Sequence, residues 1–352
     1  MSLPSDILAV VGEAAVIVRG GKVAYANIPA KEILGSSCIG KNLKALFGPD
    51  IAGVQSSSFV AGVSLGGKRY TIRVSKLDGE TVIFISPQQF PPAILNDPFL
   101  CAMRDCLMTI GISAERIRTL AEDAGQTEIL CSTAALTRSH YRLTRLATNA
   151  SLVLSMLSGS PVGSEASVDL TSLCRSIVDA AAFFLPDIHF HSDFGQEIIC
   201  HADANLIRHL LLNLISNCLV HAPDCANIYV SLTGSVESAV ISVSNDGTGI
   251  EPGKLHMVFD RFSHAFDMVQ MNSGPGLGLT VARCIAEAHG GTLLLESRVD
   301  RGTTVRASIS RRPHATLRLS APRTAPVNIT REVLTGLSDC LPPECYAERY
   351  MD

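Results

Sequence analysis

Two stretches of regularly spaced apolar residues, separated by a short turn, most constrain what this chain can fold into. Spacings of three and four residues alternate over residues 100–121 and again over residues 136–157, where one of the repeating positions is His140. This pattern is typical of a coiled-coil seam, and Gly125 marks a turn between the two helices. We expect an antiparallel helical hairpin over residues 93–160. It would form a four-helix bundle in a homodimer, or else pack against its own chain.

Composition limits the class of protein. Lys and Arg total 29 against 33 Asp and Glu, so the formal charge of −4 argues against a nucleic-acid partner. The apolar share of 47% excludes a mostly disordered chain. The eleven cysteines lack a CxxC pair or other zinc-site spacing. No apolar run approaches the roughly 20 residues of a membrane helix. We therefore expect a soluble, cytoplasmic protein without membrane insertion.

Residues 5–88 alternate short β-prone runs with turn signals. An apolar run at 14–19 precedes Gly20-Gly21, a hairpin signal, and a second extended run then leads into a short helix. Three further extended runs are expected at 58–63, 69–74 and 80–85. This order predicts an antiparallel α+β sheet with helices on one face. The letters VIVRGGKVAYANIPAKEILG, followed by IGKNLKALF, resemble the opening of a PAS sensory domain, and on that resemblance we assign residues 1–90 to a PAS-like sensory domain.

Residues 165–312 combine amphipathic helices with extended runs. Helices are predicted at 169–184 and 203–220, and strands at 227–233, 239–245, 291–298 and 303–310. Helices on one face of a mixed sheet make a two-layer α/β sandwich. Residues 313–352 are interrupted by Pro and Arg and include a short helical stretch at 330–338. We expect them to form a tail that docks locally.

A glycine-rich stretch precedes a helix that starts near residue 280. Gly274, Gly276 and Gly278 would let backbone N–H groups approach an anion, and the helix N-terminus favours negative charge. The stretch lacks the Lys-Ser/Thr of a Walker A loop, and Leu279 stands where a dinucleotide fingerprint needs glycine. By itself, a flexible turn before a helix would look the same.

Two further motifs carry polar side chains. Asp246 ends a predicted strand and is followed by Gly247 and Gly249, so a carboxylate in a partly buried slot could accept from an exocyclic amine while the glycines leave room for a flat ring. A plain hairpin turn would also explain this motif. Asn213 and Asn217 share one face of an otherwise apolar helix. They predict a Mg²⁺ site or, alternatively, two buried structural amides.

In chain order, these motifs resemble the four boxes of the GHKL ATPase superfamily, specifically the ATP-binding (HATPase_c) domain of sensor histidine kinases. The resemblance implies ATP and Mg²⁺ as cofactors. Asn217 would bind Mg²⁺ with Asn213 nearby, Asp246 would hold the adenine amino group, and Gly247 and Gly249 would lie beside the ring. The resemblance also implies that Phe259 and Phe262 anchor a mobile lid at about residues 263–273. The remaining implied ATP-binding residues form the phosphate-contacting stretch of Gly274, Gly276, Leu277, Gly278 and Leu279.

Two positions depart from the kinase pattern. Val220 stands where these kinases usually carry a basic residue, so that contact is either missing or supplied by His221. In the family, the first hairpin helix carries a phosphorylated histidine, but here Arg104 or Asp105 occupies that place. The first histidine of the chain is His140, which is either a displaced acceptor or a packed seam residue.

The sequence therefore predicts a sensor-histidine-kinase-like protein that binds Mg·ATP and acts in a two-component-type system. Its partners would be a second copy of the chain and a response regulator or partner kinase. One alternative is a degenerate pseudokinase that binds ATP and serves as a scaffold. Another is a kinase that acts on a Ser or Thr of another protein, although such kinases lack the long hairpin.

Overall fold

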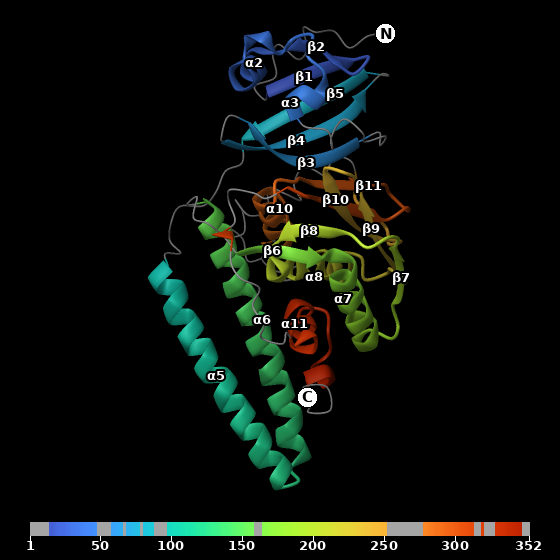
Figure 1. Cartoon of the computed structure of the whole chain (residues 1–352). Coiled ribbons are helices and arrows are strands. Elements are labelled where there is room, and N and C mark those ends of the chain that lie inside the picture. Colours follow the sequence, from blue (N-terminus) through green and yellow to red (C-terminus); the bar gives the residue numbers. More distant parts are fainter. Residues whose placement is uncertain are drawn as a thin grey trace.

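The computed structural model describes residues 14–47, 58–65, 68–77, 80–87, 97–157, 164–251, 277–312, 318–319 and 328–346. An N-terminal sheet lies at one end of the molecule, an α/β region lies in the middle, and a long helical hairpin extends away at the other end (Figure 1). Within these described residues, none of the helices combines the length and the apolar character needed to cross a membrane.

The N-terminal unit is an antiparallel sheet with short helices. Gly20 and Gly21, with φ of 56° and 75°, form the tight turn between its first two strands. Asn27 caps the first helix and also accepts from the backbone N–H of Ala15, which ties helix to sheet. The elements are β1 Ala14–Arg19, β2 Lys22–Ala26, α2 Ile28–Leu34, η1 Ser36–Cys38, α3 Leu43–Phe47, β3 Ser58–Leu65, β4 Lys68–Leu77 and β5 Glu80–Pro87.

The hairpin consists of α5 Asp97–Asp123 and α6 Thr127–Leu157, joined at Gly125 with φ 65°. The seam predicted from the sequence divides into two sets of positions. Every seventh residue from Leu107 to Ala121 is buried between the two helices, whereas Ile110 and Ile117 remain exposed. An antiparallel pair of helices therefore covers only part of its own apolar surface.

The middle region is a two-layer α/β sandwich, as predicted. Helices cover one face of a mixed sheet, and Asp169 and Asp203 cap the first two of them through their carboxylates. The elements are β6 Ser164–Asp169, α7 Leu170–Phe184, β7 His189–Phe194, β8 Ile199–Ala202, α8 Ala204–His221, β9 Asn227–Gly234, β10 Ser238–Asn245, α10 Leu277–Ala288, β11 Leu293–Ser297 and β12 Thr303–Ser310.

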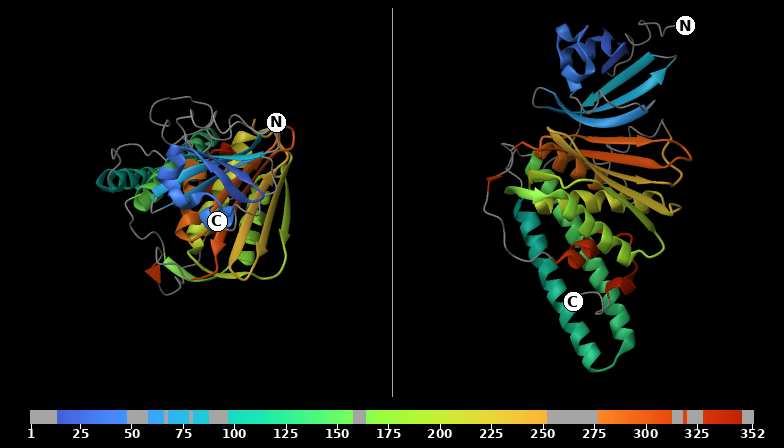
Figure 2. Two further views of the ribbon diagram at one scale, coloured as in Figure 1. Left: turned by 90° about the horizontal axis from the view of Figure 1, so that it is seen from above. Right: turned by 45° about the vertical axis from the view of Figure 1, so that its right-hand side comes forward.

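The two sheets join edge to edge, which the sequence patterns did not predict. β3 pairs antiparallel with β11, so ten strands run in the order β2-β1-β5-β4-β3-β11-β12-β10-β9-β7 (Figure 2). Leu294 on β11 is buried in the N-terminal hydrophobic core. Arg283 on α10 is fully buried and donates to Thr71 on β4, at 3.5 Å. The N-terminal unit and the sandwich are thus held together by backbone pairing and shared packing.

The segment after the sandwich contributes to the main core. It comprises β13 Arg318–Leu319, which pairs with β6, then α11 Ile329–Gly336 and η3 Pro343–Tyr346. Leu337, Leu341 and Tyr346 are fully buried in the same cluster as the sandwich helices. The expected tail therefore docks as an integral layer between α6 and the sandwich.

Candidate functional site

The first turn of α10 lies directly against two asparagines of α8. A Cβ atom at Gly278 would stand 3.0 Å from Oδ1 of Asn217 and 3.4 Å from Oδ1 of Asn213. Only a glycine fits this approach without displacing the amides. The structure thus brings together the asparagine pair and the last glycine of the glycine-rich stretch, 61 residues apart from Asn217.

The two asparagines differ in how their amides are satisfied. Asn213 is buried, its Nδ2 donates to the carbonyl of His209 at 2.9 Å, and its Oδ1 accepts from Arg145 at 3.1 Å. The Nδ2 atom of Asn217 is buried and has no hydrogen-bond partner within the described part of the chain. A buried, unsatisfied amide is costly and marks a place where a ligand group can bind. Asn213 therefore resembles a structural amide, whereas Asn217 has the properties of a binding residue.

At the end of β10, the polar side chains alternate between inside and outside. Asn245 is buried, and its Oδ1 accepts from the backbone N–H groups of Gly247 and Thr303. Asp246 is exposed, so the expected partly buried slot for its carboxylate is wrong. The inward-facing residue at this strand end is Asn245, which the sequence analysis missed. The period of two along the strand could have identified it.

The exposed Asp246 carboxylate is fixed by neighbouring donors. It accepts from the side chain of Asn227 at 2.6 Å and from the backbone N–H groups of Ala226 and Asn227, each at 3.0 Å. These hydrogen bonds lower the pKa of Asp246, with the Asn227 side chain as the largest cause. Asp246 is ionised at neutral pH and joins the β10 end to the start of β9.

The glycines after Asp246 are required by close packing. A Cβ atom at Gly247 would stand 2.6 Å from that of Ala222. Gly249 has φ 76°, and a Cβ atom there would stand 2.1 Å from the carbonyl oxygen of Arg298. Protein atoms lie where a side chain at either glycine would project. The missing side chains serve the turn itself.

The other predicted ligand residues divide into described and undescribed ones. Leu279 is buried within α10 and Leu277 is half-buried at its start. His221 is exposed at the end of α8. Four predicted residues lie outside the described residues: Phe259, Phe262, Gly274 and Gly276.

In the hairpin, the expected acceptor place is at the surface. Arg104 and Asp105 are both exposed on α5. His140 is half-buried on α6, and a Cβ atom at Gly111 would stand 2.8 Å from its ring. The ring also hydrogen-bonds the backbone of Leu107. His140 therefore packs across the hairpin against the one position of α5 that has no side chain to obstruct it.

A buried cation connects the hairpin to the asparagine pair. Arg145 on α6 donates to Asp339 at 2.6 Å as well as to Asn213. Asp339 also pairs with Arg142 at 2.8 Å, and Arg138 donates to the carbonyl of Ser338. The segment around Asp339 thus fixes α6 against the sandwich beside the candidate site. We call the contacts of Asp339 with Arg142 and Arg145 the Asp339 clasp.

Residues 202–313 match the HATPase_c family, described as histidine kinase-, DNA gyrase B- and HSP90-like ATPase. The chain is 43% identical over 105 residues to the sensor protein IrlS of Burkholderia pseudomallei, covering 29% of this chain and 22% of IrlS. It is 35% identical over 109 residues to the histidine protein kinase DivJ of Caulobacter vibrioides, covering 31% of this chain and 18% of DivJ. The match thus spans less than a quarter of the length of either relative.

Solved structures give weaker similarity. The ATP-binding domain of PrrB from Mycobacterium tuberculosis matches 42% of this chain and 98% of that chain, at 23% identity and a TM-score of 0.36. Full-length ShkA in complex with AMPPNP matches 62% of this chain and 46% of that chain, at 20% identity and a TM-score of 0.48. Scores of this size do not establish a shared whole-chain architecture.

Proposed function

We propose that this chain, which carries a HATPase_c domain and has sensor histidine kinases among its relatives, binds Mg·ATP between α8 and α10 and acts in two-component-type signal transduction. The observation that carries the proposal is the buried, unpartnered amide of Asn217 beside Gly278. The unpartnered Nδ2 of Asn217 can donate to a phosphate oxygen, and the Oδ1 of the same amide suits a hard cation. A helix N-terminus also suits phosphate. Both features meet at this point of the fold.

Several of the described residues have the chemistry to hold the nucleotide and its metal. Asn217 would hold Mg²⁺, and Gly278 with the start of α10 would face the phosphates. Asp246, whose ionised carboxylate lies at the end of β10, would accept a hydrogen bond from the adenine amino group. When bound, ATP supplies the phosphoryl group and Mg²⁺ neutralises charge on its phosphates. The protein would contribute orientation and electrostatic stabilisation.

The proposed organisation has four parts: a PAS-like sensory domain over 1–90, a dimerisation hairpin over 93–160, the ATP-binding domain over 165–312 and a tail over 313–352. The exposed apolar positions of the hairpin support a homodimer. Ile110 and Ile117 on α5, and Ile129, Leu136 and Leu143 on α6, recur every seventh residue and are 38% to 47% exposed. A second hairpin packed on this stripe would complete a four-helix bundle.

A specific observation favours the scaffold alternative over autophosphorylation. The residues at the usual acceptor place are Arg104 and Asp105, and an arginine cannot act as a nucleophile at neutral pH. His140 is packed against Gly111 and hydrogen-bonded across the hairpin. A pseudokinase would bind ATP and engage a response regulator or partner kinase without transferring phosphate to itself.

Binding is tested by titrating Mg·ATP into the full chain by calorimetry. We expect Asn217→Ala to weaken binding by at least tenfold, because it removes the proposed metal ligand. Asn205→Ala is the matched control, since Asn205 is an exposed asparagine at the other end of the same helix. Equal affinity of the two variants would rule out the proposed site.

Phosphotransfer is tested separately with γ-labelled ATP and Mg²⁺. Acid-labile, alkali-stable label on the protein that disappears in His140→Ala would identify a displaced acceptor and a working kinase. Nucleotide binding without label would support the scaffold. Label on an added protein's Ser or Thr would instead support the third function considered from the sequence.

A further inference from the structure

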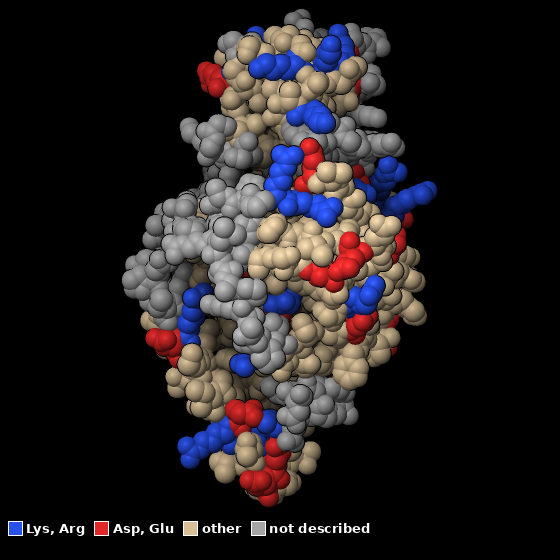
Figure 3. Space-filling model, in the orientation of Figure 1, with Lys and Arg blue, Asp and Glu red and all other residues tan. Residues whose placement is uncertain are grey.

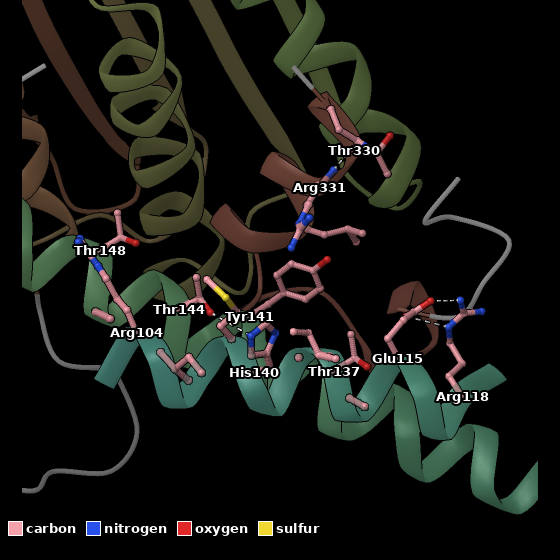
Figure 4. A pocket seen from close by; sticks show the side chains of 18 residues that line it. Arg104, Glu115, Arg118, Thr137, His140, Tyr141, Thr144, Thr148, Thr330 and Arg331 are labelled. Atoms are coloured by element: carbon pink, nitrogen blue, oxygen red, sulfur yellow. Dashed lines mark hydrogen bonds and ion pairs between the residues drawn. The ribbon is translucent and has the colours of Figure 1, made fainter. Parts of the chain in front are cut away.

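A cavity of about 690 Å³ lies between α5, α6 and the start of α11 (Figure 4). Its volume falls in the range of small-molecule sites, roughly 300–1,000 Å³. None of the asparagines or glycines of the candidate nucleotide site lines it. Figure 3 shows the face in the orientation of Figure 1, where Lys and Arg atoms lie at the edge of a hollow beside the hairpin. The cavity is therefore separate from the site between α8 and α10.

Positive charge dominates this cavity. Arg104, Arg118 and Arg331 line it, against a single acidic residue, Glu115. Glu115 is already paired with Arg118, which also pairs with Glu122 at 2.6 Å. Neither Arg104 nor Arg331 forms an ion pair with a carboxylate in the described parts of the chain. Two guanidinium groups, from two different elements, thus remain available to an anion.

His140 adds no charge to the cavity at neutral pH. Burial lowers its pKa from the usual value of 6.5, and the nearby charge of Arg331 lowers it further, opposed by the hydrogen bond with the backbone of Leu107. The ring is consequently neutral at pH 7. Among the described residues that line the cavity, the attraction for an anion therefore comes from the arginines and not from His140.

The remaining walls suit a ligand with an apolar body. Leu107, Ala114 and Leu334 line the cavity and are buried, so they form an apolar floor. Thr144 and the ring of Tyr141 face the same space (Figure 4). An apolar floor below a polar and charged rim suits a ligand that has both an apolar body and a charged group.

The cavity lies on a different side of the hairpin from the exposed apolar stripe. On α5, the stripe contains Ile110 and Ile117, whereas the cavity is lined by positions 104, 108, 111 and 115, which follow the helical spacing of three and four along another face. On α6, the stripe contains Leu136 and Leu143, and the cavity is lined by Thr137, Tyr141, Thr144 and Thr148 along another face. A second copy packed on the stripe would leave the cavity accessible.

We propose that this cavity binds a small amphipathic organic anion. Its acidic group is held by Arg331, with the positive charge of Arg104 at the other end of the cavity (Figure 4), and its apolar body lies against Leu107, Ala114 and Leu334. Leu107 and Ala114 belong to the hairpin and Arg331 to α11. A bound anion would therefore bridge the hairpin and the segment that joins it to the sandwich.

The test uses two fluorescent probes on the full chain: 8-anilinonaphthalene-1-sulfonate, which is an aromatic anion, and N-phenyl-1-naphthylamine, which has the same body without the sulfonate. We expect the double variant Arg104→Gln/Arg331→Gln to bind the anion about tenfold more weakly than the parent protein and to bind the neutral probe equally well. Both arginines are exposed, so their replacement leaves the fold intact. Arg116→Gln is the matched control, since Arg116 is an exposed arginine of the same helix that does not line the cavity.

Three results would overturn the proposal. The first is unchanged affinity of the double variant for the anion. The second is an equal loss in Arg116→Gln, which would indicate a diffuse charge effect. The third is displacement of the anion by ATP without sensitivity to the two arginines, which would place the probe in the nucleotide site.

Discussion

At the scale of single residues, buried polar groups determine how this protein responds to conditions. His209 on α8 shares a hydrogen bond of 2.6 Å with Asn149 on α6. Burial and, to a lesser degree, the nearby charge of Arg145 lower its pKa to about 4. His209 is therefore neutral in the folded protein at pH 5, where a histidine of the unfolded chain is protonated.

This difference predicts acid sensitivity. Because the folded pKa is depressed, the unfolded state binds more protons between pH 6.5 and about 4, and stability is lost as pH falls through that window. At pH 5 the loss is about 2 kcal/mol, at 1.36 kcal/mol per pH unit. We expect His209→Gln to show a smaller drop in the free energy of unfolding between pH 7.5 and pH 5, measured with urea. An equal drop in both proteins would show that His209 does not titrate in this way.

One expectation from the sequence, the partly buried carboxylate of Asp246, was wrong. The charge of Asp246 and the two glycines after it suggested a carboxylate in a partly buried slot. Strand alternation instead places Asn245 inside and Asp246 outside. The roles of Gly247 and Gly249 could not be predicted either, since the atoms that crowd them belong to Ala222 and Arg298, distant in sequence. Local motifs identify a turn but not what packs against it.

At the scale of elements, the Asp339 clasp fixes the hairpin to the sandwich. Arg145 is almost fully buried, and its two partners come from α8 and from the segment after α11. Removing one member of a buried ion pair leaves the other charge unpaired. The clasp therefore stabilises the fold and, through Arg145, holds the side chain of Asn213 in place.

We expect Asp339→Ala to lower the free energy of unfolding by roughly 2–3 kcal/mol, somewhat less than a fully buried pair because Asp339 is partly exposed. Urea denaturation of the single variants and of Asp339→Ala/Arg145→Ala would give the coupling between the two residues. Asp123→Ala, an exposed aspartate at the end of α5, serves as the control. A coupling near zero would mean that the clasp does not stabilise the joint.

Regular elements were predictable from sequence, and their long-range contacts were not. The strand at 14–19, the helix at 28–34 and the hairpin all arise from local periodicity, which is why their bounds agree closely with the structure. The pairing of β3 with β11 joins residues 233 and 235 positions apart, and the contact of Arg145 with Asp339 joins residues 194 positions apart. Backbone pairing at a sheet edge carries little sequence signal, and a single ion pair carries none.

At the scale of the whole molecule, the exposed apolar stripe of the hairpin predicts self-association. Replacing Leu136 and Leu143 by Glu places two charges on the proposed interface, so we expect this double variant to be monomeric where the parent protein is dimeric. Sedimentation velocity over a range of concentrations measures the mass. Val236→Glu is the control, because Val236 is 92% exposed and lies between β9 and β10, on the sandwich. A parent protein that is already monomeric, or a double variant that remains dimeric, would contradict the prediction.

The ten-stranded sheet has a practical consequence for anyone who divides this protein. A fragment that begins at residue 164 would leave the β11 edge without its neighbour and would uncover Leu294. Unpaired sheet edges with apolar side chains are templates for pairing with other chains, and they promote aggregation. The complementary N-terminal fragment, ending after β5, would expose the β3 edge. Separating the N-terminal sheet from the sandwich would thus produce two aggregation-prone fragments. Low solubility of either fragment would reflect the exposed strand edge and not a property of the intact protein.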